Sequence, residues 1–223
     1  GGNLGDAGGN NVGIRLALEA GAEAVWVVNP DAYPEPGSLR RLVKVLRRRP
    51  DVGIVGPRIL EADSASPRRQ SDGGRRVWEA GGRSELIGRG TAPGRGGEVR
   101  FVDFVPGAAM LVRRRVFEDV GLLPEEYFLY FEETDFCVRA ARAGWKVAVD
   151  TGARVVHRFA APDGLPAETL TYYFVRNRLL FGRRFTDVPF EALLADLDGF
   201  VGSWRRRVQE RRPEGLARFE RLV

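Results

Sequence analysis

The feature that most constrains the fold is a strand–helix–strand succession near the start of the chain. The run Ala24–Val28 (AVWVV) is short and continuously apolar, which is typical of a buried strand of a parallel sheet. Two prolines follow, then a helical pattern at Leu39–Arg48 with Ser38 as its cap, then a second apolar run at Val52–Val55. This succession predicts an α/β fold in which helices cover a sheet.

Other patterns predict the remaining elements. Further strands are expected at Phe101–Val105, Ala108–Val112, Lys146–Val149 and Arg154–Val156, with a short strand-like piece at Val77–Ala80. Helices are expected at Asn11–Ala20, Val116–Val120, Glu133–Ala143, Ala167–Arg184 and Phe190–Val208. The Gly/Asn-rich stretch Gly1–Gly13 is interpreted as a loop, and residues 61–97 as a variable excursion with a flexible part near Arg89–Gly97.

Composition limits the function classes. A length of 223 residues corresponds to one large domain or two small ones. The single cysteine, Cys137, excludes an intramolecular disulfide and fits a reducing compartment, so we expect a cytoplasmic protein. The net charge is +5, but the arginines are scattered and the chain contains no recognisable nucleic-acid-binding or P-loop motif. A nucleic-acid-binding protein is therefore the weaker alternative.

An acidic cluster among aromatic residues is the strongest chemical signal. In FLYFEETDFCVRAARAGWKV, residues 128–147, the acids Glu132, Glu133 and Asp135 lie between phenylalanine and tyrosine side chains. Carboxyl groups beside apolar rings acquire shifted proton affinities, which suits general acid–base catalysis. The alternative is structural, because acids also stabilise the positive end of a helix.

Two further polar positions follow predicted strands. Asn29-Pro30-Asp31 comes directly after Ala24–Val28, and His157, the only histidine, comes directly after Arg154–Val156. Ligands bind at the carboxyl ends of strands in open α/β sheets, and Asp, Asn and His side chains suit Mg²⁺ or Mn²⁺. The alternatives are an Asx-type turn at Asn29 and a histidine without a functional role.

These motifs together resemble one enzyme family. The segments GNNVGIRLALEAGAEAVWVVNPD, FVPGAAMLVRRRVFEDVGLLPEEYFLYFEETDFCVRAARAGWKVAVDTGARVVH and YYFVRNRLLF are similar to the family-two inverting glycosyltransferases of the GT-A fold, in particular to the rhamnosyltransferase-like branch. The resemblance covers roughly residues 1–185. It implies a mixed, mostly parallel sheet flanked by helices, with helices at the C-terminal end.

The resemblance also implies roles for single residues. Glu133 matches the catalytic base, although the family commonly has Asp there, and Glu132 and Asp135 match the neighbouring acids. Asn29 and Asp31 match the DxD-like motif at the donor nucleotide and its metal, and His157 matches a metal ligand. Gly107 matches the glycine of an acceptor-side loop, and Asn11 lies in the matching donor-side segment GGNLGDAGGNN.

The implied activity is transfer of a sugar, with rhamnose as one candidate. A nucleoside-diphosphate sugar would be the donor, and a hydroxyl of a cell-surface glycan or a lipid-linked molecule the acceptor, with Mg²⁺ or Mn²⁺ as cofactor. In the family an N-terminal strand–helix–strand precedes the motifs found here, so we expect a chain that lacks these strands and is inactive by itself. A truncated domain that only binds a partner is the alternative.

The C-terminal part is expected to differ from the rest. We predict a glycosyltransferase domain at residues 1–185 and a helical, basic extension at residues 186–223. The extension has apolar residues at helical spacing followed by arginines at Arg205, Arg206, Arg207, Arg211 and Arg212. Packing on the domain is the favoured interpretation, and peripheral contact with an anionic membrane at the inner face of the plasma membrane is the second.

Overall fold

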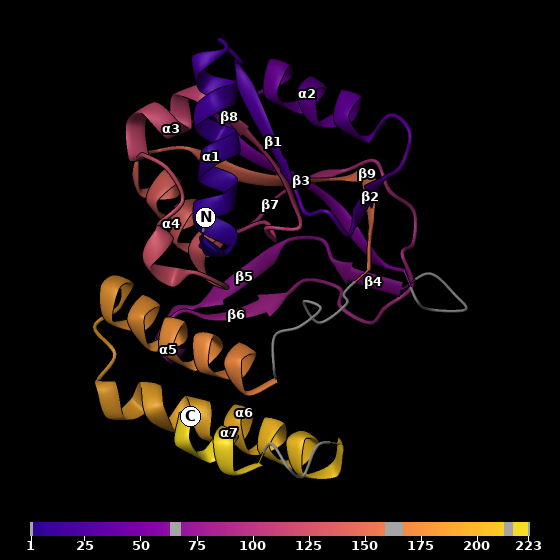
Figure 1. Cartoon of the computed structure of the whole chain (residues 1–223). Coiled ribbons are helices and arrows are strands. Elements are labelled where there is room, and N and C mark those ends of the chain that lie inside the picture. The colour runs from indigo at the N-terminus through magenta and orange to yellow at the C-terminus, as the bar shows by residue number, and fades with distance from the viewer. Residues whose placement is uncertain (1, 63–67, 159–166, 212–215, 223) are drawn as a thin grey trace.

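The computed structural model describes residues 2–62, 68–158, 167–211 and 216–222 (Figure 1). Its centre is a seven-stranded sheet. The main strand order is β1 (Ala24–Val28), β8 (Ala109–Arg113), β3 (Val52–Glu61), β9 (Lys146–His157) and β2 (Ala32–Pro34). In addition, β4 (Arg68–Ser71) pairs with β3, and β7 (Val99–Phe101) pairs with β9.

The sheet is mixed, as expected, and helices flank it. The strands β1, β3 and β9 run in the same direction, but the reversed strand β8 lies between β1 and β3. As a result, β3 and β9 form the one parallel pair of neighbours among the described strands, and the other neighbours pair antiparallel. The predicted α/β class is confirmed.

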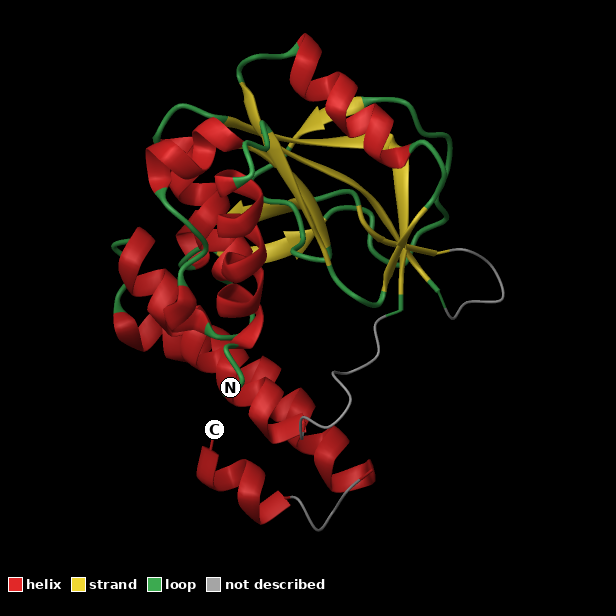
Figure 2. Cartoon of the chain, turned by 45° about the horizontal axis from the view of Figure 1, so that its top comes forward, coloured by secondary structure: helices red, strands yellow, loops and turns green. Residues whose placement is uncertain are grey.

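Helices cover both faces of the central sheet (Figure 2), and alternate residues of the central strands pack on opposite helical layers. On one face, Ile54 and Val112 pack with residues of α1 (Gly5–Glu19), α3 (Arg114–Val120) and α4 (Glu132–Arg142). On the other face, Val55 and Leu111 pack with Leu42, Val45 and Leu46 of α2 (Ser38–Arg48). Successive side chains of a strand point to opposite faces of the sheet. Because helices cover both faces, the strands are apolar at successive positions.

Several local predictions differ from the structure, among them the strand expected at Phe101–Val105, which is β7 at Val99–Phe101. The predicted loop Gly1–Gly13 is wrong for Gly5 onward, because α1 begins there and packs its N-terminal end on Phe128. The amide of Asp6 donates to the Phe128 carbonyl at 2.7 Å, and a Cβ on Gly5 would lie 2.3 Å from that oxygen. Tertiary packing thus overrides the low helix propensity of glycine.

The strands predicted at Lys146–Val149 and Arg154–Val156 are one strand, β9. Ser38 is the first helical residue, and its hydroxyl donates to the Arg154 carbonyl.

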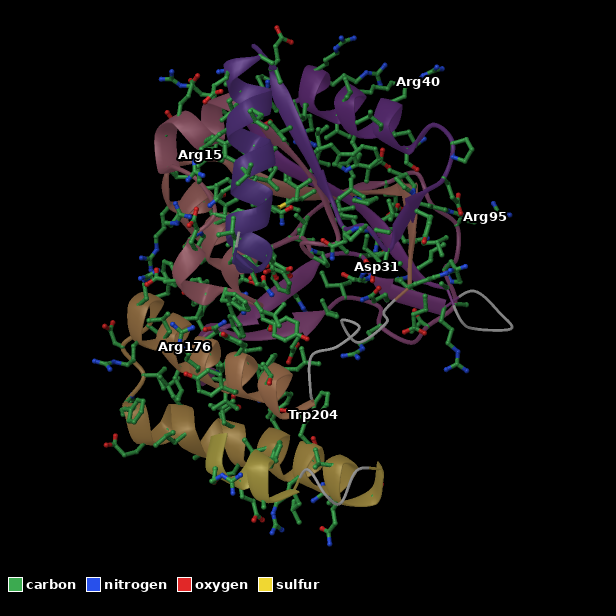
Figure 3. The ribbon with its side chains drawn as sticks, viewed as in Figure 1. Arg15, Asp31, Arg40, Arg95, Arg176 and Trp204 are labelled. Atoms are coloured by element: carbon green, nitrogen blue, oxygen red, sulfur yellow. The ribbon has the colours of Figure 1, made fainter. Side chains whose placement is uncertain are left out.

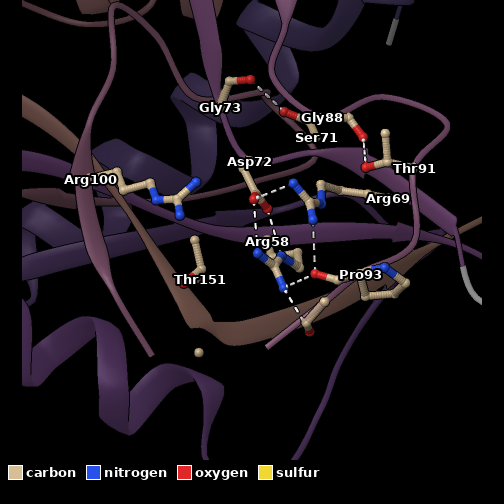
Figure 4. A network of polar contacts seen from close by, with 12 residues as sticks. Arg58, Arg69, Ser71, Asp72, Gly73, Gly88, Thr91, Pro93, Arg100 and Thr151 are labelled. Carbon is tan, nitrogen blue, oxygen red and sulfur yellow. Dashed lines mark hydrogen bonds and ion pairs between the residues drawn. The ribbon is translucent and has the colours of Figure 1, made fainter. Parts of the chain in front are cut away.

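The excursion at residues 61–97 is anchored to the sheet by a buried ion pair. It contains β4 and a hairpin of β5 (Gly74–Val77) and β6 (Arg83–Leu86), joined through a short 3₁₀ turn, Trp78–Ala80, where a strand was expected. Arg58 on β3 donates to both carboxylate oxygens of Asp72, at 2.6 and 2.8 Å, and Arg69 contacts the same carboxylate at 3.0 Å (Figure 4). Arg58 also donates to the Pro93 carbonyl, so the segment near residues 89–97 is held as well.

The C-terminal helices α5 (Ala167–Phe185) and α6 (Phe190–Arg211) lie side by side below the sheet, with α7 (Leu216–Leu222) beside them (Figure 1). Leu193 and Leu197 of α6 are buried, and the Asp196 carboxylate contacts Arg178 on α5 at 3.1 Å. These contacts agree with packing of the extension on the domain. No helix among the described residues is long and apolar enough to cross a bilayer. The proposed boundary at residue 185 stays a prediction.

Candidate functional site

The loop that leads into the acidic helix is strained. Phe128, Tyr130 and Phe131 all have positive φ angles, between 63° and 75°, which non-glycine residues adopt rarely. The side-chain amide of Asn177 on α5 donates to the carbonyls of Tyr127, Leu129 and Tyr130 at 2.7–2.9 Å. These contacts, which we call the Asn177 clamp, fix the backbone directly before Glu132 and Glu133. Strain that is held by surrounding contacts is common at functional sites.

At the edge of the sheet, Asp31 and His157 meet. Ala32 on β2 is paired in register with His157 at the end of β9, which places the preceding Asp31 beside the imidazole. The distance from His157 Nε2 to Asp31 Oδ1 is 3.2 Å, and the distance from His157 Nδ1 to Gln70 Oε1 on β4 is 3.0 Å. The expected approach of Asp31 and His157 across this edge is thus found in the structure (Figure 3 labels Asp31).

One cavity of about 520 Å³ joins this edge to the acidic helix. Its sheet-edge side contains Asn29, Gln70 and His157, and α1 contributes Asp6 and Asn10. Glu132 and Glu133 line it from α4, together with Gly107, where an added Cβ would lie 3.7 Å from Glu133 Cγ. Its opposite side is formed by α5 and α6, through Phe174, Arg178, Asp196, Leu197 and Phe200.

Glu132 and Glu133 differ in their electrostatic surroundings. Burial, reinforced by the charge of Glu133, raises the pKa of Glu132 well above its ordinary value, and its Oε2 has no hydrogen-bond partner among the described residues. Burial also raises the pKa of Glu133, but the positive charge of Arg76 and a 3.1 Å hydrogen bond from the Thr134 hydroxyl favour its charged form. The surroundings therefore favour the charged form more at Glu133 than at Glu132, which makes Glu133 the carboxylate that is available to accept a proton.

Arg76, on β5, supplies the buried positive charge near Glu133. Its guanidinium lies over the rings of Phe104 and Phe181, at 4.5 and 4.6 Å from their centroids, and donates to the Gly82 carbonyl. Burial lowers the pKa of Arg76 to about 10, and the charge of Glu133 acts in the opposite direction. The sequence did not single out Arg76, because it lies in the excursion, far from the acidic cluster along the chain.

Two of the predicted site residues have structural surroundings instead. Asp135 is fully buried and accepts hydrogen bonds from Tyr127, Arg139 and Arg184 at 2.6–3.0 Å, so both of its oxygens are engaged away from the cavity. Asn11 is buried too, and its amide bonds the Leu123 backbone and the Glu125 carboxylate. Neither residue lines the cavity described above. From α1 the residues that do line it are Asp6 and Asn10, one helical turn apart.

Asp6 and Gln70 are further residues that sequence reasoning missed. Although solvent reaches Asp6, desolvation by its surroundings and the nearby charge of Asp31 raise its pKa. Gln70 contacts His157 from a strand whose pairing the sequence did not predict. The rule that ligands bind at strand ends located Asp31 and His157, but it does not apply to Asp6 or Gln70, because neither follows a strand that the sequence predicted.

The residues present fit a divalent cation that is shared with a ligand. Among the described residues, no set of three His, Cys, Asp or Glu side chains could enclose a metal ion. Asp31 and His157 supply two suitable donors, and Gln70 orients the imidazole through its other nitrogen. Mg²⁺ is commonly held by one or two side chains together with substrate phosphates and water, so this pair suits a cation that binds with a diphosphate.

Comparisons with known proteins identify the family of the chain. A family model described as "Glycosyltransferase like family 2" matches residues 5–178. The chain is 34% identical over 208 residues to a low-salt glycan biosynthesis hexosyltransferase of Haloferax volcanii, covering 90% of this chain and 66% of that protein. It is 32% identical over 191 residues to an N-acetylglucosaminyl-diphospho-decaprenol L-rhamnosyltransferase of Mycobacterium tuberculosis, covering 74% of this chain and 60% of that protein.

A solved structure shares the fold. The crystal structure of GalNAc-T7 with UDP, GalNAc and Mn²⁺ superposes with a TM-score of 0.54 at 13% sequence identity, covering 92% of this chain and 43% of that one. The chain spans 60–66% of the length of the two curated relatives named above.

Proposed function

This chain belongs to the glycosyltransferase-like family 2, and on that premise we propose that it serves in the transfer of a sugar from a nucleoside-diphosphate donor to an acceptor hydroxyl, with inversion at the anomeric carbon. The acceptor class is a glycan or a lipid-linked glycan. The observation that carries the proposal is the shared cavity, which His157 and Asn29 line from the sheet edge and Glu133 lines from α4. This arrangement supports a donor site and a general base that act on one bound substrate; Asp31 lies beside His157 but is not itself among the residues that line the cavity.

In the proposed reaction Glu133 accepts the proton of the acceptor hydroxyl. The hydroxyl oxygen forms a bond to the anomeric carbon while the bond from that carbon to the diphosphate breaks, and the diphosphate leaves with the electron pair. Glu133 has the right surroundings, because Arg76 and Thr134 favour its charged form before the reaction. Burial raises the pKa of Glu132 and so favours its protonated form, which would add no second negative charge beside the base.

Asp31 and His157 would hold Mg²⁺ or Mn²⁺ at the donor diphosphate, with Gln70 fixing the ring orientation. Such a cation neutralises charge that develops on a diphosphate leaving group. The crystal structure of GalNAc-T7, which shares the fold, contains UDP and Mn²⁺, and this supports the expectation of a divalent cation. The relative from Mycobacterium tuberculosis is named for a rhamnosyl transfer to a diphospho-decaprenol, which supports rhamnose and a lipid-linked acceptor as the first candidates.

The first experiment measures binding, which does not depend on turnover. Retention on immobilised UDP, dTDP and GDP is measured with Mg²⁺ or Mn²⁺ and with a chelator. We expect retention that requires the cation and is lost in Asp31→Asn, whereas Asp51→Asn, an acid paired with Lys146 on the surface, retains wild-type binding. Retention that ignores both the chelator and Asp31→Asn would show that the metal assignment is wrong.

The second experiment measures transfer from the donors that bind, in a protein that carries this chain together with the N-terminal strands that the family resemblance implies. Glu133→Gln keeps the shape of the side chain and removes proton acceptance, so we expect unchanged nucleotide retention and a transfer rate lower by about 10²–10⁴-fold. Glu118→Gln, on the surface of α3, is the matched control. Nucleotide retention without transfer in the wild-type chain would favour the alternative of a binding domain.

A further inference from the structure

The side of the cavity that faces away from the sheet edge is built by helices α5 and α6. It contains Phe174, Leu197 and Phe200, together with the ion pair of Arg178 and Asp196. We call these five residues the helical wall. The proposed function assigns the sheet edge to the donor and α4 to the base, and it leaves this wall without a role.

Electrostatic interactions and ring contacts connect the two sides of the cavity through the acidic helix. On the donor side, Asp31 and Asp6 interact electrostatically, and so do Asp6 and Glu132. Phe131 directly precedes Glu132, and its ring meets that of Phe174 at a centroid distance of 5.5 Å. The ring of Phe174 in turn stacks on that of Phe200 at 4.1 Å, with 23° between the ring planes. The acidic pair therefore lies between the donor edge and the helical wall.

Inversion sets the direction from which the acceptor arrives. The attacking oxygen approaches the anomeric carbon on the face opposite to the leaving group. With the diphosphate at Asp31 and His157, the acceptor has to enter from the side beyond Glu133. The helical wall is one surface that the described residues offer there, beside Arg83, Ser84 and Leu86 of β6.

The chemistry of the wall indicates which molecule fits. Stacked aromatic rings match the apolar face of a pyranose ring, and Asp196 can serve its hydroxyl groups. Asp196 Oδ2 accepts from Arg178 and Oδ1 from Arg83, at 3.1 and 3.0 Å, and each oxygen keeps a further lone pair for a hydroxyl donor. A hydrocarbon chain at the same place would displace water from Arg178 and Asp196. It would offer no hydrogen bonds in place of those that the water made, which is unfavourable.

We propose that the helical wall is the acceptor subsite and that it binds a pyranose ring, which stacks on Phe200 and donates hydroxyl hydrogen bonds to Asp196. This assignment rests on the proposed function and adds the residues that select the acceptor. It makes α6 part of the reaction site as well as part of the fold.

The test compares acceptor and donor kinetics in two matched variants. Octyl glycosides of N-acetylglucosamine, glucose, mannose and rhamnose serve as acceptors, and octanol serves as a hydroxyl compound without a ring. Phe200→Leu keeps apolar volume but removes the ring. Because a ring contact contributes about 0.5–1.5 kcal/mol, we expect the acceptor KM to rise about 2- to 10-fold, with donor KM unchanged. Phe190→Leu, on the exposed face of the same helix, should leave both constants unchanged.

Each other outcome points to a different conclusion. An unchanged acceptor KM in a folded Phe200→Leu variant overturns the subsite, as does a rise confined to the donor KM. Transfer to octanol as efficient as to every glycoside overturns the pyranose assignment and favours a hydrocarbon at the wall, and so does donor hydrolysis with no transfer to any glycoside. If the wild-type protein that includes the N-terminal strands consumes no nucleotide sugar at all, the proposed function fails, and the subsite fails with it.

Discussion

Asp72→Asn is the substitution whose effect on stability the structure specifies most sharply. The side chains of Arg58 and Asp72 are 2% and 0% exposed, and Asp72 accepts two hydrogen bonds from Arg58 (Figure 4). The amide keeps the volume but loses the charge, so the buried guanidinium of Arg58 is left without its counter-ion. Each charge-assisted hydrogen bond contributes about 1.5–3 kcal/mol, and breaking one partner of a buried pair costs about 3–5 kcal/mol in total.

The assay is urea unfolding, followed by circular dichroism at neutral pH. We expect Asp72→Asn to lower the free energy of unfolding by about 3–5 kcal/mol. Glu98→Gln removes the carboxylate from the exposed pair with Arg100, and we expect a loss below about 1 kcal/mol. The double substitution Arg58→Met with Asp72→Leu replaces the pair by apolar groups and should recover much of the loss.

Two results would refute this reasoning. One is a cost for Asp72→Asn no larger than that of Glu98→Gln, and the other is a double variant less stable than the single one. The same substitution also tests a link to the site. Gln70 lies between Arg69 and Asp72 along the chain and orients His157, so cation-dependent nucleotide retention should weaken in Asp72→Asn even where the chain is folded.

Two further predictions concern the acidic helix. Because burial raises the pKa of Glu132 above its reference value of 4.5, the native state retains a proton that the unfolded state loses, and stability falls as pH rises above that value. Glu132→Gln removes this pH dependence. The melting temperature of the variant should therefore exceed that of the wild type by an amount that grows between pH 5 and pH 8. A difference that stays constant over this range would contradict the raised pKa of Glu132. Asn177→Leu removes the Asn177 clamp, whose two amide hydrogens serve three carbonyls, so about two bonds are lost at about 1–2 kcal/mol each. Urea unfolding should show a loss of about 2–4 kcal/mol, with faster hydrogen exchange at residues 127–135, and a loss below about 1 kcal/mol would show that the loop holds itself.

Local sequence patterns were sufficient to predict those strands and helices whose structure depends on the residues within them. The apolar runs at Ala24–Val28 and Val52–Val55 are strands, because alternate side chains pack on both helical layers. The acids near Glu133 were found because aromatic neighbours are visible in the sequence. The start of α1 was missed because its stability comes from packing against Phe128, which is distant along the chain.

The same distinction holds within the site. Asp31 and His157 follow strands, so a rule about strand ends placed them at one edge. The sequence pointed to Asn11 instead of Asp6 because it does not give the rotation of α1, and that rotation decides which residues face the cavity. Gln70 and Arg76 act on residues that are distant along the chain, and no local pattern encodes such contacts.

The part of α5 beyond the Asn177 clamp also anchors the acidic segment, and this anchor has a consequence for protein engineering. Similarity to the family model ends at residue 178, but α5 continues to Phe185. Phe181 still contacts the ring of Phe131, and Arg184 still bonds Asp135, beyond that point. A chimera joined at the similarity boundary would divide this anchor between two parents. A crossover in the short connection at residues 186–189 keeps the anchor whole and exchanges only the helices that follow it, so we expect folded hybrids from the second junction and poorly folded ones from the first.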